Sequence, residues 1–195
     1  MITNKKKKLI AIAAVLIANC PLLKGLAEPV TVELPADSSL TEVGEVDGIL
    51  EIVSDGVLLQ TIPVDEVGDL TLSGMNSSGD ITVSTITRLD GSLSIEGDVG
   101  SVTFDGPVAV GGATTVAANG TIRANALFSS GTGIRFDAGN QIQLNNSAVT
   151  TVAGSLSFVS TADISLVNSS INTGSHAGSA TDQSAAEIVK QWEDI

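Results

Sequence analysis

Cysteine is almost absent from this chain of 195 residues, because Cys20 is the only one. A single cysteine cannot form an internal disulfide, so the fold must be held together without covalent cross-links. Aromatic residues make up only 3% of the chain, with no tyrosine, one tryptophan and four phenylalanines. This is little material for a glycan-binding aromatic platform. We expect Phe104, Phe136 and Phe158 to be buried instead, since they stand at inward positions of short strands.

Basic residues are also few. The chain has nine Lys and Arg against 22 Asp and Glu, a formal net charge of −13. Five of the nine lie in residues 1–27, and the remaining four are scattered: Arg88, Arg123, Arg135 and Lys190. Nucleic acid and anionic lipid both need clustered Lys or Arg, so the composition argues against either as a partner.

The first 27 residues have the pattern of a secretory signal peptide. A basic patch, Lys5 to Lys8, is followed by the apolar run LIAIAAVLIA and then by small residues up to Ala27. This is the order of charged, apolar and cleavage regions that export signals share. The run is shorter than the roughly 20 residues of a permanent membrane anchor. We therefore expect export, cleavage after Ala27, no membrane span afterwards, and a secreted or cell-surface location.

Cys20 offers a second way of processing this segment. The stretch Ile17-Ala18-Asn19-Cys20 resembles the lipobox of bacterial lipoproteins, in which the cysteine is lipidated and becomes the mature N-terminus. Asn19 departs from the small residue that usually precedes this cysteine. Lipidation of Cys20, which implies an outer-membrane lipoprotein, therefore stays as the alternative to cleavage after Ala27.

A repeat with an interval of 22 residues lies near the end of the chain. IQLNNSAV at 142–149 recurs as ISLVNSSI at 164–171, and the same shift pairs Ile134-x-Phe136 with Leu156-x-Phe158. Apolar and polar residues alternate in these pieces, which is the period-two pattern of a strand with one buried face. The repeat therefore predicts short strands that recur at a fixed interval.

A looser form of the same pattern continues upstream. Gly, then Asp or Ser, then alternating apolar and hydroxyl residues recur as GDLTL, GDITV, GSLSI, GSVTF and GSLSF, beginning at residues 68, 79, 91, 100 and 154. Dipeptides such as Asp55-Gly56 and Asn119-Gly120 punctuate the pattern, because Asn, Asp and Gly suit sharp corners. Many short strands indicate an all-β protein. The fixed interval favours a parallel β-helix, or β-solenoid, over a sandwich.

In such a solenoid, equivalent residues of successive coils lie one above the other, about 4.8 Å apart. Phe136 would stack on Phe158 inside the coil. Asn146 would lie over Asn168 as an amide ladder at a corner. These four residues form the predicted structural ladder.

The predicted segments are a signal peptide at 1–27, an N-terminal β cap at 28–67, a β-solenoid of about five to six coils at 68–174, a linker at 175–183 and a short C-terminal amphipathic helix at 184–195. Within the cap, residues 46–64 read as a hairpin around Asp55-Gly56 that could close the end of the solenoid.

The last segment has two interpretations. Ser184 and Glu187 match a capping box, and Ile188, Val189, Trp192 and Ile195 fall on one helix face. The helix either covers the last coil, because solenoid ends expose unpaired strand edges, or docks a partner protein through Trp192.

Residues 135–174 resemble the repeat region of filamentous-haemagglutinin-type adhesins, which are bacterial right-handed parallel β-helices with similar Gly-apolar-x-apolar and Asn-Ser-x-apolar units. The resemblance extends loosely over residues 68–174. It implies a secreted or surface-attached adhesion protein. The implied partner is a cell-surface or extracellular-matrix component.

An enzymatic role has less support. Parallel β-helices that act on acidic polysaccharides need carboxylates clustered with Arg or Lys on adjacent coils. The candidates are Asp90, Glu96, Asp98, Asp105, Arg123, Arg135 and Asp137. Most of these acids stand beside Gly at turns, where Asp is expected for local reasons. The only histidine, His176, falls in the linker, and the sequence has no nucleophile elbow, phosphate loop or metal-ligand spacing. We expect no enzyme, no catalytic residue, no cofactor and no metal.

Two classes of function therefore remain. The first is a structural or adhesive protein that acts through repetitive solenoid faces, with a fibre subunit that self-associates end to end as a variant. The second is a polysaccharide-binding or polysaccharide-active β-helix. Paired carboxylates on successive coils would favour the second class.

Overall fold

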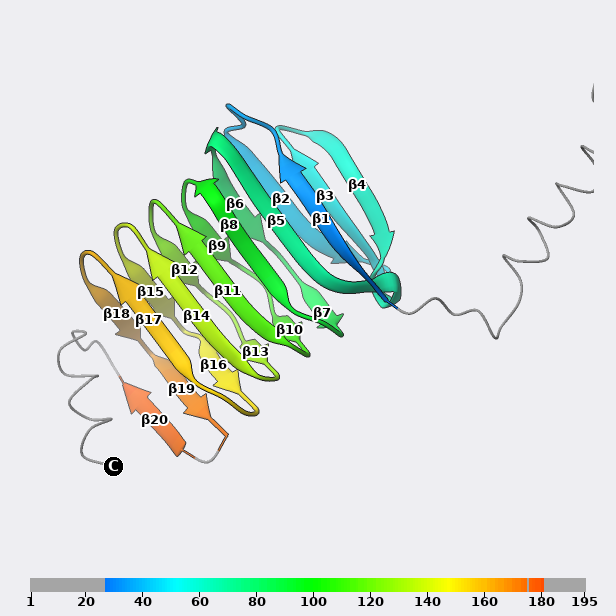
Figure 1. Ribbon diagram of the computed structural model, residues 1–195. Helices are drawn as coiled ribbons and strands as arrows, with labels where there is room; N and C mark the ends of the chain where they lie inside the picture. Colours follow the sequence, from blue (N-terminus) through cyan, green and yellow to red (C-terminus); the bar gives the residue numbers. More distant parts are fainter. Residues whose placement is uncertain (1–26, 175, 181–195) are drawn as a thin grey trace, which may run out of the picture.

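The structure is a computed structural model that describes residues 27–174 and 176–180 (Figure 1). Residues 67–173 wind into five successive coils, each contributing one strand to each of three sheets. Neighbouring strands of successive coils pair in parallel. The prediction of an all-β parallel solenoid is confirmed.

We name the three sheets A, B and C. Sheet A contains, in spatial order, β1 (Glu28–Leu34), β5 (Val67–Ser78), β8 (Leu93–Val99), β11 (Ala113–Ala118), β14 (Gly133–Ala138) and β17 (Leu156–Ser160). Sheet B contains β4 (Val57–Pro63), β3 (Ile49–Ser54), β2 (Leu40–Val46), β6 (Asp80–Val83), β9 (Val102–Phe104), β12 (Ile122–Ala124), β15 (Ile142–Asn145) and β18 (Ile164–Val167). Sheet C contains β7 (Ile86–Leu89), β10 (Val108–Val110), β13 (Phe128–Ser130), β16 (Ala148–Thr151), β19 (Ser169–Thr173) and β20 (His176–Ala180).

The coils differ slightly in length. In sheet A, pairs link Leu72 to Ile95, then to Val116, Phe136 and Phe158, which gives intervals of 23, 21, 20 and 22 residues. The 22-residue repeat of the sequence is therefore the last interval of this series. Ile142 pairs with Ile164, and Val149 with Ile171, as the repeat predicts. The corners absorb part of the variation, and register shifts in the β5–β8 and β7–β10 pairs absorb the rest. Elsewhere a one-residue slip within a strand would turn its apolar side chains outward.

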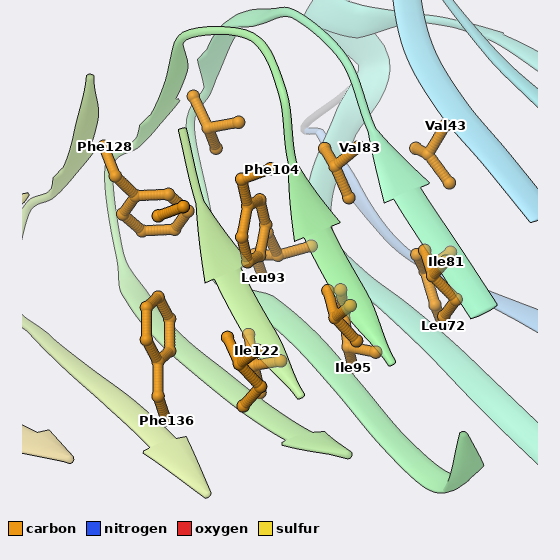
Figure 2. Close-up of a cluster of buried hydrophobic side chains, with 14 of the residues drawn as sticks. Val43, Leu72, Ile81, Val83, Leu93, Ile95, Phe104, Ile122, Phe128 and Phe136 are labelled. Carbon is orange, nitrogen blue, oxygen red and sulfur yellow. The ribbon is translucent and has the colours of Figure 1, made fainter. Parts of the chain in front are cut away.

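Alternation along the strands directs every second side chain into one continuous core. In β9 and β12 the first and last residues are buried and the middle residue is half-buried. Figure 2 shows Val43, Ile81 and Val83 of sheet B together with Leu72 and Ile95 of sheet A, all within this core. Each such side chain contributes roughly 1.5–3 kcal/mol when fully buried. Apolar burial thus stabilises a fold that has no disulfide.

The Gly-Asp and Gly-Ser motifs lie at corners where backbones of successive coils approach closely. The amide of Gly91 donates to the carbonyl of Gly68 at 3.1 Å, and the amide of Gly112 donates to that of Gly91 at 2.7 Å. A Cβ on Gly91 would stand 2.3 Å from the Gly68 oxygen. Glycine is required at this position because any side chain would collide with the coil before it.

A hairpin closes the N-terminal end of the solenoid (Figure 1). The partners Leu34 and Gly74 are separated by 40 residues, because β3 and β4 are inserted in this coil. β3 pairs antiparallel with β2, and β4 pairs antiparallel with β3. Leu50 and Ile52 of β3 are buried in the core at 1% and 0% exposure. The hairpin turns at Asp55 and Gly56, which have φ of 48° and 77°, the left-handed region that tight hairpin turns require.

The C-terminal end differs from the sequence prediction. Residues 175–183 were predicted as a linker, but His176–Ala180 forms β20, which pairs antiparallel with β19. The chain reverses after Thr173 through Gly174, whose φ is 59°, and can then follow the edge of β19. The predicted helix at 184–195, and residues 1–26 of the predicted signal peptide, lie outside the described residues. Within the described residues, no helix is long and apolar enough to span a membrane.

Candidate functional site

The predicted Asn ladder lies at the corner between sheets B and C. Asn168 donates from Nδ2 to Oδ1 of Asn146 at 3.3 Å, and both residues have φ of 49°. Asn tolerates this left-handed conformation better than most residues. Beside them, the hydroxyl of Ser169 accepts the backbone amide of Ser147 at 3.3 Å, and both serines are 4% exposed. The corner is thus an internally bonded structural element.

A second ladder, which sequence reasoning missed, runs through three coils at the end of the sheet B strands. Asn125 donates from Nδ2 to Asp105 Oδ1 at 2.7 Å, and Asn145 donates to Asn125 Oδ1 at 3.4 Å. The signal is the constant spacing of 20 residues among these three positions. It escapes a search made at the 22-residue interval because the coils here are shorter.

The phenylalanines form a cluster inside the solenoid. The ring centroids of Phe136 and Phe158 lie 5.5 Å apart with a 40° tilt, and those of Phe104 and Phe136 lie 5.9 Å apart and nearly parallel. Phe128, which was not predicted to point inward, packs edge-to-face against Phe104 at 4.8 Å and is 1% exposed (Figure 2). Phe158 is only partly buried. Leu127 and Phe128 are adjacent apolar residues, so the sequence pattern does not show which of them points inward. In the structure Phe128 pairs with the buried Val108, and Leu127 is exposed.

Two predicted site residues cannot be placed. Cys20, the alternative lipidation site, lies outside the described residues. So does Trp192, the alternative partner-docking residue. His176 lies in β20 rather than in a linker.

The carboxylates considered for polysaccharide chemistry are bonded to near neighbours. Asp98 accepts from Asn119 Nδ2 at 2.5 Å, and Asp105 accepts from Asn125. Glu96 accepts from the Ser94 hydroxyl at 3.4 Å. These acids bond within a strand or to the adjacent coil, which is a structural use of the side chain.

The charged pairs and the remaining arginine lie on different sheets. Arg135 and Asp137 form an ion pair of 2.8 Å on β14 of sheet A, while Arg123 on β12 of sheet B donates to Gln143 at 2.9 Å. Asp90 is paired with Arg88 at 2.5 Å just beyond β7 of sheet C. The fold therefore spreads the candidate residues over three faces. Among the described residues, no group of three or more His, Cys, Asp or Glu could hold a metal ion.

A shallow depression lies at the ends of β7 and β10. It has a volume of about 370 Å³ and is lined by Arg88, Leu89, Asp90, Ala109, Val110 and Gly111. The Arg88 side chain is 79% exposed at its edge. A guanidinium and a carboxylate together offer both donors and acceptors, which suits hydroxyl-rich ligands.

Asp55 joins the hairpin turn to the strand beside it. Its Oδ1 accepts from the Ser39 hydroxyl at 2.5 Å and from the backbone amides of Ser39 and Leu40 at 3.1 Å. These hydrogen bonds, the Ser39 hydroxyl first, lower the pKa of Asp55 below its ordinary value because they favour the charged carboxylate. The carboxylate anchors the hairpin to the start of β2.

The outward faces of the three sheets carry rows of mostly uncharged polar side chains. Register places the following residues in line along the solenoid: Thr71, Ser94, Thr115, Arg135 and Ser157 on sheet A; Thr82, Thr103, Arg123, Gln143 and Ser165 on sheet B; and Ala109, Ser129, Thr150 and Asn172 on sheet C. Strands of a sheet lie about 4.8 Å apart, so each row repeats a polar contact at this spacing. We call these the outward rows.

The described residues thus define a β-solenoid with five coils, a hairpin at one end and polar outward rows. Comparison with known proteins finds no matching family, no matching curated protein and no matching solved structure.

Proposed function

We propose that the chain is a secreted or surface-attached bacterial protein with a structural or adhesive role, which acts through the outward rows of its solenoid. The observation that carries the proposal is the repetition of hydroxyl and amide side chains along each sheet. The N-terminal export pattern supports an extracellular location, and the likeness of residues 135–174 to filamentous-haemagglutinin-type repeats supports adhesion.

Repetition matters because it makes binding multivalent. A single Thr or Ser offers one weak hydrogen bond to a partner. A row of three to five polar side chains on a rigid face presents several hydrogen bonds at once to an extended polymer, and the later contacts form at high effective concentration. Extended cell-surface or matrix polymers are therefore the partners that this surface suits best.

Beads coated with the purified protein test the proposal by their retention on cells and on extracellular-matrix polymers. A triple variant, Thr82→Lys, Thr103→Lys and Ser165→Lys, changes the sheet B row and leaves the buried side chains intact. Its matched control makes the same change at Thr71, Ser94 and Ser157 of sheet A. Loss of retention in one triple variant and not in the other supports face-specific adhesion. Equal retention of the wild type and both variants contradicts it.

A polysaccharide-binding role is the second candidate, and the depression beside Arg88 and Asp90 favours it. A sugar hydroxyl could accept from the guanidinium and donate to the carboxylate at this edge. A glycan array probed with the wild type and with Arg88→Ala tests this role. Glycan binding by the wild type that is lost in Arg88→Ala supports the polysaccharide-binding role. Glycan binding that is equal in the two proteins excludes this depression as the site.

A further inference from the structure

One charged side chain stands on the outward face of sheet B where four of its strands lie side by side. The strands β9, β12, β15 and β18 contribute Arg123 and otherwise only uncharged residues. Its neighbours in the outward row are Thr103 on β9 and Gln143 on β15, and all three side chains are half-buried. A positive charge therefore lies on this face among groups that donate and accept hydrogen bonds.

Arg123 differs from the other two arginines of the described residues in having no carboxylate partner. Arg88 pairs with Asp90 at 2.5 Å, and Arg135 pairs with Asp137 at 2.8 Å. Within the described part of the chain, Arg123 forms no ion pair, although the protein has 22 acids against nine bases. The protein therefore leaves the charge of Arg123 without a neutralising carboxylate in direct contact.

Two glutamine amides hold the guanidinium of Arg123 in a fixed orientation. Nε of Arg123 donates to Oε1 of Gln143 at 2.9 Å, and Nε2 of Gln143 donates to Oε1 of Gln141 at 2.9 Å. Within residues 27–174 and 176–180, Nη1 and Nη2 of Arg123 have no hydrogen-bond partner. These two nitrogens form the planar fork that matches the two oxygens of a carboxylate. The amides thus occupy one side of the guanidinium and leave its fork for a ligand.

The surrounding charge limits the kind of anion that this face can take. Asp105 follows β9 and Asp163 precedes β18, and the whole chain is strongly acidic. A densely sulfated or phosphorylated polymer needs clustered bases and is repelled by such a protein. A polymer with separate carboxylates among many hydroxyl groups needs one cation at a time and neutral hydrogen-bonding groups around it. Uronate sugars, each of which carries one carboxylate, meet both conditions.

We propose that Arg123 is an anion subsite on the outward face of sheet B and binds the carboxylate of a uronate unit in an extended polysaccharide. Nη1 and Nη2 donate in parallel to the two carboxylate oxygens. The hydroxyls of Thr103 and Thr82, about 4.8 Å and about 9.6 Å along the row, bond to sugar hydroxyls. This inference rests on the adhesive function proposed above, because it names the partner of one outward row.

Fluorescently labelled oligosaccharides of glucuronate, galacturonate and mannuronate test the subsite by fluorescence anisotropy, each as the free carboxylate and as the neutral methyl ester. We expect the wild type to bind at least one carboxylate form, and to bind its ester roughly tenfold more weakly, because a charge-assisted bidentate contact is lost. Arg123→Gln should weaken binding of the carboxylate form to the same extent. The variant should keep its β signal in circular dichroism, because residue 123 faces outward on β12.

Two further variants separate the geometry of the contact from net charge. Arg135→Gln also removes one positive charge, but on β14 of sheet A, and should leave the affinity nearly unchanged. Arg123→Lys keeps the charge and replaces the planar fork by a single ammonium group, so it should restore only part of the binding. Affinity of Arg123→Lys equal to that of the wild type would overturn the bidentate contact.

The proposal is overturned if no carboxylate oligosaccharide binds, or if carboxylate and ester bind equally. It is also overturned if Arg123→Gln and Arg135→Gln lose the same affinity, because attraction by net charge alone then explains the binding. Bead retention on cells and matrix polymers separates these failures from failure of the adhesive role. Beads that are retained equally with the wild type and with Arg123→Gln leave adhesion in place without this subsite. If no beads are retained, adhesion fails, and the soluble oligosaccharides still decide whether Arg123 binds uronate.

Discussion

Asp69 and Ser92 are joined across two coils: Oδ1 of Asp69 accepts the backbone amide of Ser92 at 2.7 Å. Asp80 and Ser101 repeat this contact at 2.7 Å one corner later. In each case the aspartate follows a glycine, and the serine whose amide donates also follows a glycine. The Gly-Asp motif therefore connects one coil to the next, which explains why aspartates at these corners are structural.

Replacement of Asp69 by Ala should lower the free energy of unfolding by about 1 kcal/mol, because a hydrogen bond to a charged acceptor is lost at an exposed corner. Asp69→Asn keeps an acceptor oxygen and should lose less. Urea unfolding followed by circular dichroism measures both variants. Equal stability of the Ala variant and the wild type would show that the contact has no energetic role.

Gly91→Ala should be more damaging. Its Cβ would stand 2.3 Å from a backbone oxygen that cannot move without shifting the previous coil, and overpacking of this kind costs about 1–3 kcal/mol. Gly48→Ala is the control, because its Cβ meets nothing within 4 Å and only the positive φ of 77° opposes it. That strain costs about 1–2 kcal/mol. Thermal unfolding compares the two, and a smaller loss for Gly91→Ala would contradict the close approach seen at this corner.

Phe136→Ala should remove about 3–5 kcal/mol of stability, since the side chain is fully buried and its ring contacts those of Phe104, Phe128 and Phe158. Phe158→Ala should cost clearly less because Phe158 is only partly buried. Denaturant midpoints of the two variants provide the test. A larger loss of stability for Phe158→Ala than for Phe136→Ala would contradict the central position of Phe136 in the aromatic cluster.

The hydrogen bonds to Asp55 should make the stability of the folded protein depend on pH. Its pKa is lowered in the folded protein, so its contribution to stability is present above the ordinary aspartate pKa of about 3.9 and is lost as the pH falls through the folded value. The difference in urea midpoint between the wild type and Asp55→Asn should therefore be largest near neutral pH and shrink in acid. A difference that grows on acidification would have the wrong sign for a carboxylate stabilised by hydrogen bonds.

Export should leave a defined N-terminus. Cleavage after Ala27 yields a protein that begins at Glu28, where β1 also begins. Mass spectrometry of the protein recovered from outside the cytoplasm measures this terminus, and Cys20→Ala should leave it unchanged. A lipid-modified N-terminal Cys20 that disappears in the variant would show lipoprotein processing instead.

Local pattern was enough to predict much of the solenoid. The octets at 142–149 and 164–171 place Ile142 over Ile164 because identical spacing on two strands of one sheet has only one inward register. Asp55-Gly56 predicts a hairpin turn because few other residue pairs accept two positive φ angles. The Asn146 and Asn168 positions follow from the same reasoning at a corner. In these cases the determining interactions lie within a few residues of the chain.

Other features depended on residues 20 to 40 positions apart. Phe128 points inward because it pairs with Val108 and Val149, and Asp105, Asn125 and Asn145 meet because the intervening coils have one length. His176–Ala180 depends on partners of shorter range: it became a strand because β19, whose paired residues stand 3 to 11 positions earlier, offered an edge. The sequence by itself determined the repeated strands within residues 134–171, their 22-residue register and the turn at Asp55-Gly56. Only the tertiary structure decided which coils are short, which corners form ladders and which candidate acids lie apart. The reason is that the length of each coil determines which of its residues lie beside those of the next coil.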